Sequence, residues 1–236
     1  AVLGSKGTAG AGPDYGHELT PAATLPYYTF ARTIGGVIHE QFQDCLVSEL
    51  VISADTGGPL TATATVMGTR ATFLGSEPAA AVDLASSEVY NFNNATVSEG
   101  GSPTSLVSSF ELTISNNVSL QQTDDSVPYD VIAGTFSVAL SYDKILVDDD
   151  NYREFHYGTT SGTAQSNTIV EKSIEFAFSL GANNDVTFTM DHMAFEEYPV
   201  DPDPGGDPIV VPTRCRAQRD LTDPAVIAVV NNQKAT

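Results

Sequence analysis

Hydrophobic and polar residues alternate along much of the chain with the period of two that is typical of β-strands. In LVSSFELTIS the residues Phe110, Leu112 and Ile114 alternate with polar neighbours, and the same period recurs in EKSIEFAFSL and DVTFTM. Successive side chains of a strand point to opposite faces, so this period predicts strands with one buried face. Segments of this kind are residues 35–53, 60–74, 89–98, 106–120, 134–143, 171–181, 185–195 and 225–232. They predict an all-β, mainly antiparallel sandwich.

Two hairpins are predicted, and one of them has an unusual second strand. The clearer hairpin joins residues 171–181 to residues 185–195 through the turn GANND. The other covers residues 45–68, where the cluster ADTGGP marks the turn. Two small residue types alternate along its second strand: Thr61, Thr63 and Thr65 with Ala62 and Ala64. We expect the threonines to share one water-exposed face and the alanines to face inward against a closely packed layer.

The remaining segments predict one short helix, a loop and a terminal arm. DDDNYREFHYG, residues 148–158, has aspartates before its first turn and a glycine to end it, so it predicts a helix. A weaker helical pattern covers residues 77–88, and the proline-rich residues 199–212 predict a loop or an edge excursion. Residues 1–34 predict an extended arm, either ordered by a neighbouring subunit or frayed. Residues 35–236 are expected to form a single domain.

The charge balance changes the picture of possible partners. The chain has 10 basic and 30 acidic residues, a formal charge of −20 and a pI near 4.2. Affinity for a phosphate backbone comes mainly from Lys and Arg, so this balance excludes nucleic-acid-binding proteins. Three explanations fit the acidity: solubility at high concentration, secretion into a salty medium, or a surface that faces a polyanion without binding it.

No motif in the sequence points to catalysis, a cofactor or a metal. The sequence has no glycine-rich phosphate loop, no Gly-x-Ser-x-Gly elbow and no Cys-x-x-Cys, and its 4 histidines are dispersed. The acidic groups at residues 148–150, 196–197 and 201–207 are explained by helix capping, opposite strand faces and an exposed turn. Cys45 and Cys215 are interpreted as two reduced thiols. We therefore predict a protein that is not an enzyme.

Membrane and export signals are not recognisable in the sequence. No apolar run approaches the ~20 residues that span a bilayer, and the first residues have no apolar core of signal-peptide type. We therefore expect no membrane partner and synthesis in the cytoplasm.

Three segments resemble the major tail tube proteins of long non-contractile tailed bacteriophages. They are DCLVSELVISADTGGPLTATATVMGTRAT, VYNFNNATVSEGGSPTSLVSSFELTISNN and AGTFSVALSYDKILVDDDNY. The likeness covers most of residues 35–199 and lies in the texture and order of the strands. It implies a β-sandwich with a small flanking helix, six copies of which join edge to edge into a ring-shaped barrel. It also implies that the rings stack into a tube through which DNA passes.

The resemblance also implies partners and a location. The partners are further copies of the chain and the tape measure, tail terminator and distal tail proteins, while DNA passes without specific binding. The location is the virion tail, assembled in the cytoplasm of the host bacterium, and Thr61, Thr63 and Thr65 become candidates for channel-facing residues. The alternatives are a phage decoration or baseplate protein, a bacterial surface or adhesion module, and a carbohydrate-binding sandwich. The last is disfavoured because the chain has 0 Trp.

Overall fold

The computed structural model describes residues 4–9, 15–77, 89–181, 184–201, 208–218 and 224–232. Their strands are β1 (Gly4–Ala9), β2 (Tyr15–Pro21), β3 (Tyr28–Ile34), β4 (Ile38–Asp55), β5 (Thr61–Met67), β6 (Arg70–Phe73), β7 (Ala95–Glu99), β8 (Ser102–Thr104), β9 (Val107–Ser115), β10 (Ser119–Gln121), β11 (Asp130–Ile132), β12 (Ser137–Ile145), β13 (Glu171–Ser179), β14 (Asp185–Glu197), β15 (Val210–Ala217) and β16 (Ile227–Asn232). The helices are η1 (Phe92–Asn94), a single 3-10 turn, and α1 (Asp150–Tyr157). The described strand pairs are antiparallel, which confirms the predicted mainly antiparallel β fold with a short helix.

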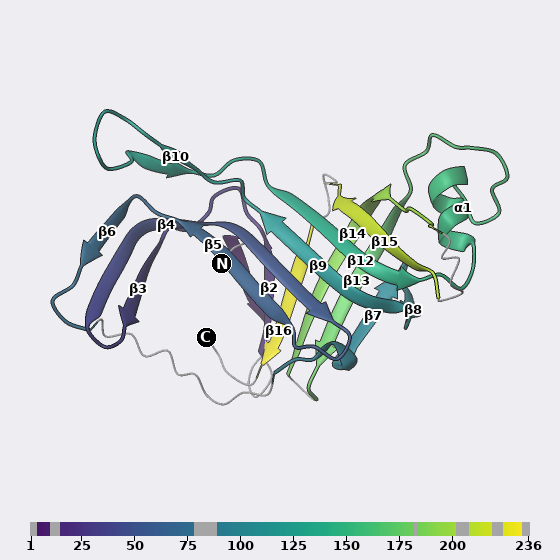
Figure 1. The fold of residues 1–236 in the computed structure, drawn as a ribbon, viewed down its shortest axis with the longest axis horizontal. Coiled ribbons are helices and arrows are strands. Elements are labelled where there is room, and N and C mark those ends of the chain that lie inside the picture. The colour runs from purple at the N-terminus through teal and green to yellow at the C-terminus, as the bar shows by residue number, and fades with distance from the viewer. Residues whose placement is uncertain are drawn as a thin grey trace.

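One continuous 14-stranded sheet folds over on itself into two layers (Figure 1). The first layer has the order β5-β4-β9-β12-β15. β15 also pairs with the end of β14, which leads into a second layer where β14 pairs with β13 and β16. From there β13 leads to β7 and β8, and β16 leads to β2 and β1. β9 and β13 do not pair, yet the rings of Phe110 and Phe176 stack with centroids 4.3 Å apart. The two layers therefore face each other as a sandwich.

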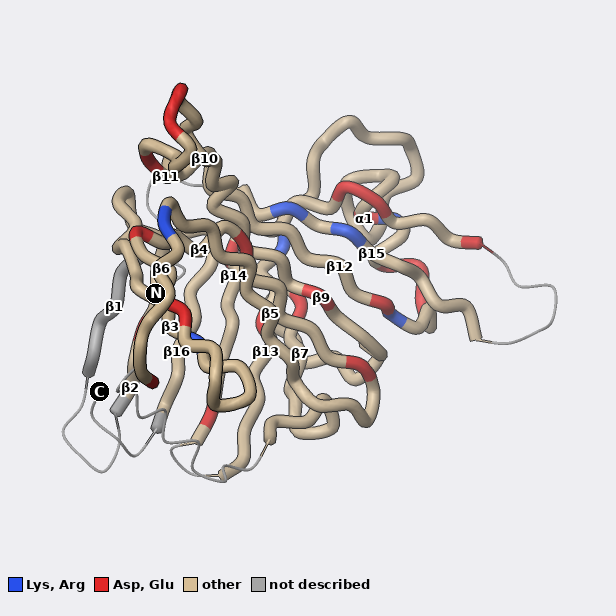
Figure 2. The backbone as a smooth tube through the Cα atoms, turned by 60° about the vertical axis from the view of Figure 1, so that its left-hand side comes forward, with Lys and Arg blue, Asp and Glu red and all other residues tan. Residues whose placement is uncertain are grey.

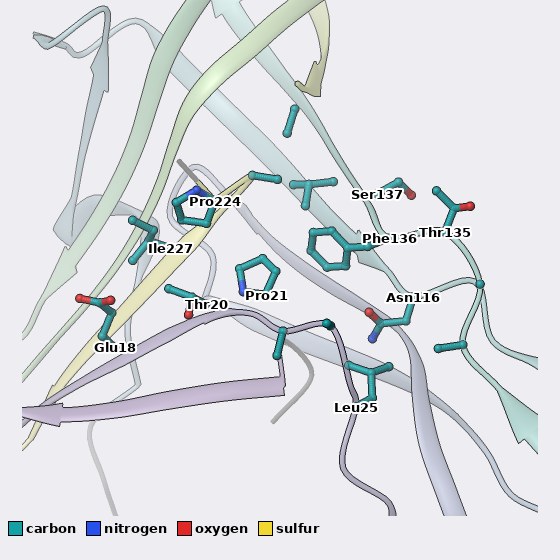
Figure 3. Close-up of a pocket in the computed structure, with 17 residues that line it drawn as sticks. Glu18, Thr20, Pro21, Leu25, Asn116, Thr135, Phe136, Ser137, Pro224 and Ile227 are labelled. Atoms are coloured by element: carbon teal, nitrogen blue, oxygen red, sulfur yellow. The ribbon is translucent and has the colours of Figure 1, made fainter. Parts of the chain in front are cut away.

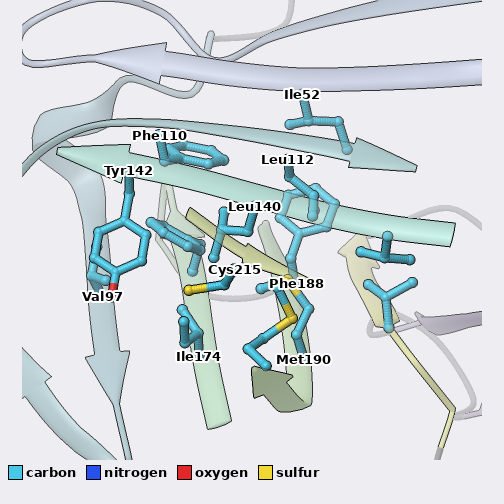
Figure 4. Packing of buried hydrophobic residues seen from close by; sticks show 14 of the residues in the cluster. Ile52, Val97, Phe110, Leu112, Leu140, Tyr142, Ile174, Phe188, Met190 and Cys215 are labelled. Atoms are coloured by element: carbon cyan, nitrogen blue, oxygen red, sulfur yellow. The ribbon is translucent and has the colours of Figure 1, made fainter. Parts of the chain in front are cut away.

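The core between the layers consists of alternate residues of the facing strands. Buried residues alternate with less buried ones along β9, β12 and β13, as the sequence period predicts. Figure 4 shows the side chains from the two layers packed together, including Leu112 and Leu140 from the first layer and Ile174 and Met190 from the second. The predicted hairpin of β13 and β14 is confirmed, because Phe176 lies opposite Phe188 in its register.

β4 extends beyond the sandwich and forms a three-stranded projection with β3 and β6 (Figure 1), which we call the β-arm. Leu46–Ser53 pairs with β5, whereas Ile38–Gln43 belongs to the β-arm. Between them Asp44 has a φ of 53°, in the left-handed region where L-residues are uncommon. A Cβ on Gly68 would lie 2.5 Å from Sγ of the buried Cys45, so only glycine fits there without a shift. The β-arm therefore leaves the sandwich at a closely packed junction.

α1 confirms the helix predicted within residues 148–158. It ends at Gly158, which has a φ of 81° and donates its backbone N–H to the carbonyl oxygen of Glu154. Asp149 occupies the N-cap position without a side-chain capping hydrogen bond, and it forms an ion pair with Arg153 at 2.5 Å. From residue 78 onward, the weaker helical pattern at residues 77–88 lies outside the described residues.

The segments predicted as an extended arm, residues 1–34, and as a loop or an edge excursion, residues 199–212, both contain strand residues. In the N-terminal 34 residues, β1 pairs with β2, β2 pairs with β16, and β3 pairs with β4. The proline-rich tract ends in β15, which begins at Val210, so the loop does not extend to residue 212. Pro212 lies opposite Asp143 on β12, and β15 pairs with β14 only from Arg214 onward. A proline without an N–H group is tolerated at such an edge.

Candidate functional site

The first layer has a polar face on the side opposite the core, which we call the outer face. The strand register aligns its residues in rows that cross β5, β4, β9, β12 and β15. One row is Thr63, Val51, Thr113, Ala139 and Arg216, and the next is Thr61, Ser53, Glu111, Ser141 and Arg214. Short side chains, many with hydroxyl groups, dominate these rows. The outer face is therefore smooth and polar.

Carboxylate side chains give the outer face a negative charge on three of its strands, β4, β9 and β12. Its carboxylates are Glu49 and Asp55 on β4, Glu111 on β9 and Asp143 on β12. Among the described residues, these four carboxylates form no ion pair with a lysine or arginine, whereas Oγ of Ser109 donates a hydrogen bond of 2.9 Å to Asp143. Figure 2 shows that acidic positions outnumber basic ones along the described chain. The carboxylates leave a negative potential on this face.

The two arginines of the outer face are held by carboxylates at its far edge. Arg214 lies 3.3 Å from Glu197, and Arg216 lies 3.0 Å from Glu196. Both partners lie at the end of β14, which pairs with β15 at this point. The sequence suggested no role for these arginines, and the signal that could have revealed them is their alternation with buried residues of β15.

The register places the residues singled out on β5 on two opposite faces of the strand. Thr61, Thr63 and Thr65 lie opposite Ser53, Val51 and Glu49, respectively, on the outer face. The alanines share the core-side face, with Ala62 opposite the buried Ile52 and Ala64 opposite Leu50. All five residues are exposed in the single subunit. Among the described residues, no layer covers the two alanines.

β5 is also an edge strand. It pairs with β4 on one side, and no described strand pairs with it on the other. Its sequence, TATATVM, contains no charged residue and no proline, which are the residues that usually block pairing at an edge. Such an edge is available for pairing with a second chain.

The strongest cluster of buried charge lies beneath α1. Glu99 on β7 forms an ion pair of 2.5 Å with Lys144 on β12, and the hydroxyl of Tyr142 donates to it at 2.9 Å. Asn151 on α1 donates to both carboxylate oxygens of Glu99 and accepts from Lys172 at 2.8 Å. Lys172 also forms an ion pair with Glu154 of α1. These contacts fasten the helix to the sandwich.

The environment of this cluster shifts several pKa values. Burial alone would raise the pKa of Glu99. The opposite effect is larger and comes from the hydrogen bond and charge of Lys144, the charge of Lys172 and a hydrogen bond from Asn151, so the pKa of Glu99 is lowered. Burial, and then the charge of Glu99, raise the pKa of Tyr142 well above 10.0 and that of Tyr198 to about 12. Glu99 is therefore charged at neutral pH, as its ion pair with Lys144 requires, and the two tyrosines stay neutral, which is a structural role.

Reactive chemistry has little support in the described ranges. Cys45 and Cys215 are both buried and free, and burial followed by the charge of Glu99 raises the pKa of Cys215 far above its ordinary value. Within the part of the chain that the structure describes, no group of three or more His, Cys, Asp or Glu side chains could hold a metal ion. No described helix is long and apolar enough to cross a membrane.

Comparison with known proteins gives one informative match. A family model described as phage tail tube protein matches residues 1–217. No curated protein matches the chain. The family match includes every described helix and strand except β16, and it ends at the last residue of β15.

Proposed function

The chain belongs to the phage tail tube protein family, and from that membership we propose that it forms stacked hexameric rings in the tail of a long non-contractile tailed phage. The family is one of structural proteins of the virion tail, and it implies self-assembly into a tube. In our proposal the tube is the conduit for genome ejection and is assembled in the host cytoplasm. The tape measure, tail terminator and distal tail proteins are its further partners.

The outer face of the first layer carries this proposal, because it has the properties of a channel lining that does not retain DNA. Its four carboxylates lack cationic partners among the described residues, and its two arginines are neutralised by Glu196 and Glu197. Fixed negative charge repels phosphates over about a Debye length, ~8 Å at physiological salt. Thr61, Thr63 and Thr65 complete this lining with short hydroxyl side chains.

The unpaired edge of β5 supplies the means of closing a ring. If β5 pairs with an edge of the neighbouring subunit, the first layers of six subunits join into one barrel and the exposed edges disappear. The alanines of β5 then face a packed layer between subunits, while its threonines face the channel. The N-terminal strands, at the margin of the second layer, serve as the terminal arm that contacts a neighbour.

Electron microscopy of the purified protein tests the assembly. We expect hollow tubes or stacked rings with six subunits per ring, because a tail tube protein self-associates through matching surfaces. Negative-stain images at several protein and salt concentrations provide the measurement. A protein that stays monomeric under all of these conditions contradicts the proposal.

The double substitution Glu49→Lys and Glu111→Lys tests the repulsive lining. We expect tubes of normal appearance but slower DNA ejection from phage that carry the variant, because two charges per subunit change from repulsive to attractive. The slowing should diminish as salt is raised. Ejection rates are measured by dye fluorescence of released DNA. Glu171→Lys with Glu175→Lys on β13, outside the first layer, is the control, and equal rates for all three phages contradict a DNA-repelling outer face.

A further inference from the structure

A lysine, an asparagine and a glutamate meet beneath α1 with their reactive groups in contact. Nζ of Lys172 on β13 donates a hydrogen bond of 2.8 Å to the amide oxygen Oδ1 of Asn151 on α1. Nζ also forms an ion pair with Glu154, which lies three residues after Asn151 on the same side of the helix. A carbonyl bond is ~1.23 Å long, so Nζ lies within about 4 Å of the amide carbon Cγ. An amine and an amide carbon at this separation need only a small movement to react.

The charges on its two sides fix the orientation of the Asn151 amide. Its Nδ2 donates to both carboxylate oxygens of Glu99, at 3.1 and 3.2 Å. Its oxygen accepts from the ammonium group of Lys172, which can only donate. Half a turn of the amide would place its oxygen against a carboxylate and its nitrogen against an ammonium group. The carbonyl therefore faces the amine, and the nitrogen that would leave is held against an anion.

The contact between these groups is largely shielded from water. The side chains of Lys172 and Glu154 are only 17% and 21% exposed. The centroid of the Phe195 ring lies 5.8 Å from Nζ, and Asn151 is buried. Burial disfavours charged groups, so it favours transfer of a proton from Lys172 to Glu154. The transfer gives a neutral carboxylic acid and a neutral amine, which is the nucleophilic form of lysine.

The other buried asparagine of the described chain is not placed beside an amine. Asn116 lies in the wall of a cleft of about 910 Å³ (Figure 3). Its Nδ2 donates a hydrogen bond of 2.9 Å to the backbone carbonyl oxygen of Val47. The described residues that line this cleft include no lysine. Asn116 is therefore an internal control, because its amide is buried without a nucleophile in the same cleft.

We propose that Lys172 and Asn151 form an intramolecular isopeptide bond after the chain has folded. Glu154 takes a proton from the ammonium group of Lys172, and the neutral Nζ attacks Cγ of Asn151. In the tetrahedral intermediate Nζ gives a second proton to one oxygen of Glu154, while the other oxygen returns the first proton to Nδ2. The bond between Cγ and Nδ2 then breaks, and ammonia leaves. The ammonia takes the remaining proton from Glu154 and departs as an ammonium ion, which the carboxylate of Glu99 stabilises.

The bond closes residues 151–172 into a covalent loop that ties α1 to β13. Figure 1 shows α1 at the margin of the fold, where the ion pairs and hydrogen bonds of the cluster fasten it to the sandwich. A covalent loop restricts the unfolded chain as a disulfide does, and an isopeptide bond also survives reduction. The reaction occurs once per chain and turns over no substrate. It consumes neither Glu99 nor Lys144, so their ion pair remains in the linked chain.

Mass spectrometry of the full-length folded protein tests the bond, whether or not the protein forms tubes. After incubation at mildly alkaline pH, we expect an intact mass lower than that of the sequence by one ammonia molecule. Proteolysis should then release a branched peptide that joins Asn151 to Lys172, while the amide of Asn116 stays intact. An unchanged mass overturns the proposal. Loss of ammonia without the branched peptide indicates a cyclic imide at an asparagine, and loss of one water molecule indicates a bond to Glu154; both also overturn it.

Three single variants assign the roles of the residues. Lys172→Arg keeps the positive charge beside Glu154 but removes the amine, so it should retain the full mass of its sequence. Lys144→Arg is the matched control, because it changes the other lysine of the same cluster and should still lose ammonia. Glu154→Gln cannot take the proton, so the bond should form roughly 100-fold more slowly. Circular dichroism confirms the fold of each variant. A folded Lys172→Arg that loses ammonia with a branched peptide at Asn151, or an unchanged rate in Glu154→Gln, contradicts these roles.

Discussion

Glu99→Gln is expected to lower the free energy of unfolding by about 3–5 kcal/mol, because it removes the carboxylate that ion-pairs with the buried Lys144. The side chains of Lys144 and Glu99 are only 13% and 8% exposed, so water cannot replace the lost partner. The substitution also weakens the hydrogen bonds from Tyr142 and Asn151. Urea denaturation of the dilute protein at pH 7 gives the free energy of unfolding.

The same substitution should reduce the loss of stability in acid. The pKa of Glu99 lies below its ordinary value of 4.5 in the folded chain, so the folded chain holds this proton less tightly than the unfolded chain. The stabilisation is therefore complete above pH 4.5 and is lost as the pH falls through the folded pKa. Below that pKa, the unaltered chain and Glu99→Gln should converge in stability.

Glu111→Gln is the matched control for this prediction. Glu111 lies on the exposed outer face without an ion pair to another described residue, so its substitution should change the free energy of unfolding by less than about 0.5 kcal/mol. Equal losses for the two variants at pH 7 would show that the cluster beneath α1 is no more than a solvated surface network.

The sequence predicted the strands in which buried apolar residues alternate with polar ones. Phe110, Leu112 and Ile114 alternate with polar residues, and they occupy the core face of β9 as predicted. The start of β15 was not predicted because a proline such as Pro212 usually indicates a loop. Pro212 is compatible with a strand here because β15 pairs with β14 only from Arg214 onward, so one side of β15 is unpaired at Pro212. The ion pair of Glu99 with Lys144 joins residues far apart in the chain, and no local pattern encodes it.

The candidate surfaces were predictable to a smaller extent. The alternation of threonine and alanine in β5 predicts two different faces of the strand, and the packing of the alanines stays a prediction because both are exposed in the single subunit. The acidic character of the outer face depends on register among strands from distant parts of the chain, which a single sequence does not give. The β-arm depends on the turn of the chain at Asp44, which has a positive φ. An aspartate in a sequence does not by itself predict a positive φ, so the turn could not be predicted.

Ala64→Lys is expected to abolish tube formation, whereas Thr63→Lys is expected to preserve it. Ala64 is exposed in the single subunit, so the variant should fold with little change in stability. In the proposed ring this residue faces a packed layer, and burying an unpaired ammonium there costs several kcal/mol. A cost of about 3 kcal/mol per contact lowers the association constant more than a hundredfold.

Thr63→Lys is a stringent control because it places the same charge on the adjacent residue of β5, on the opposite face. Electron microscopy and sedimentation of both variants, with circular dichroism to confirm the fold, give the comparison. Tubes formed by Ala64→Lys would put the alanines on a solvent-facing surface, and loss of tubes in Thr63→Lys would put the threonines in an interface. Because the two side chains differ only in the direction in which they leave one strand, the pair of results fixes which face of β5 borders the channel.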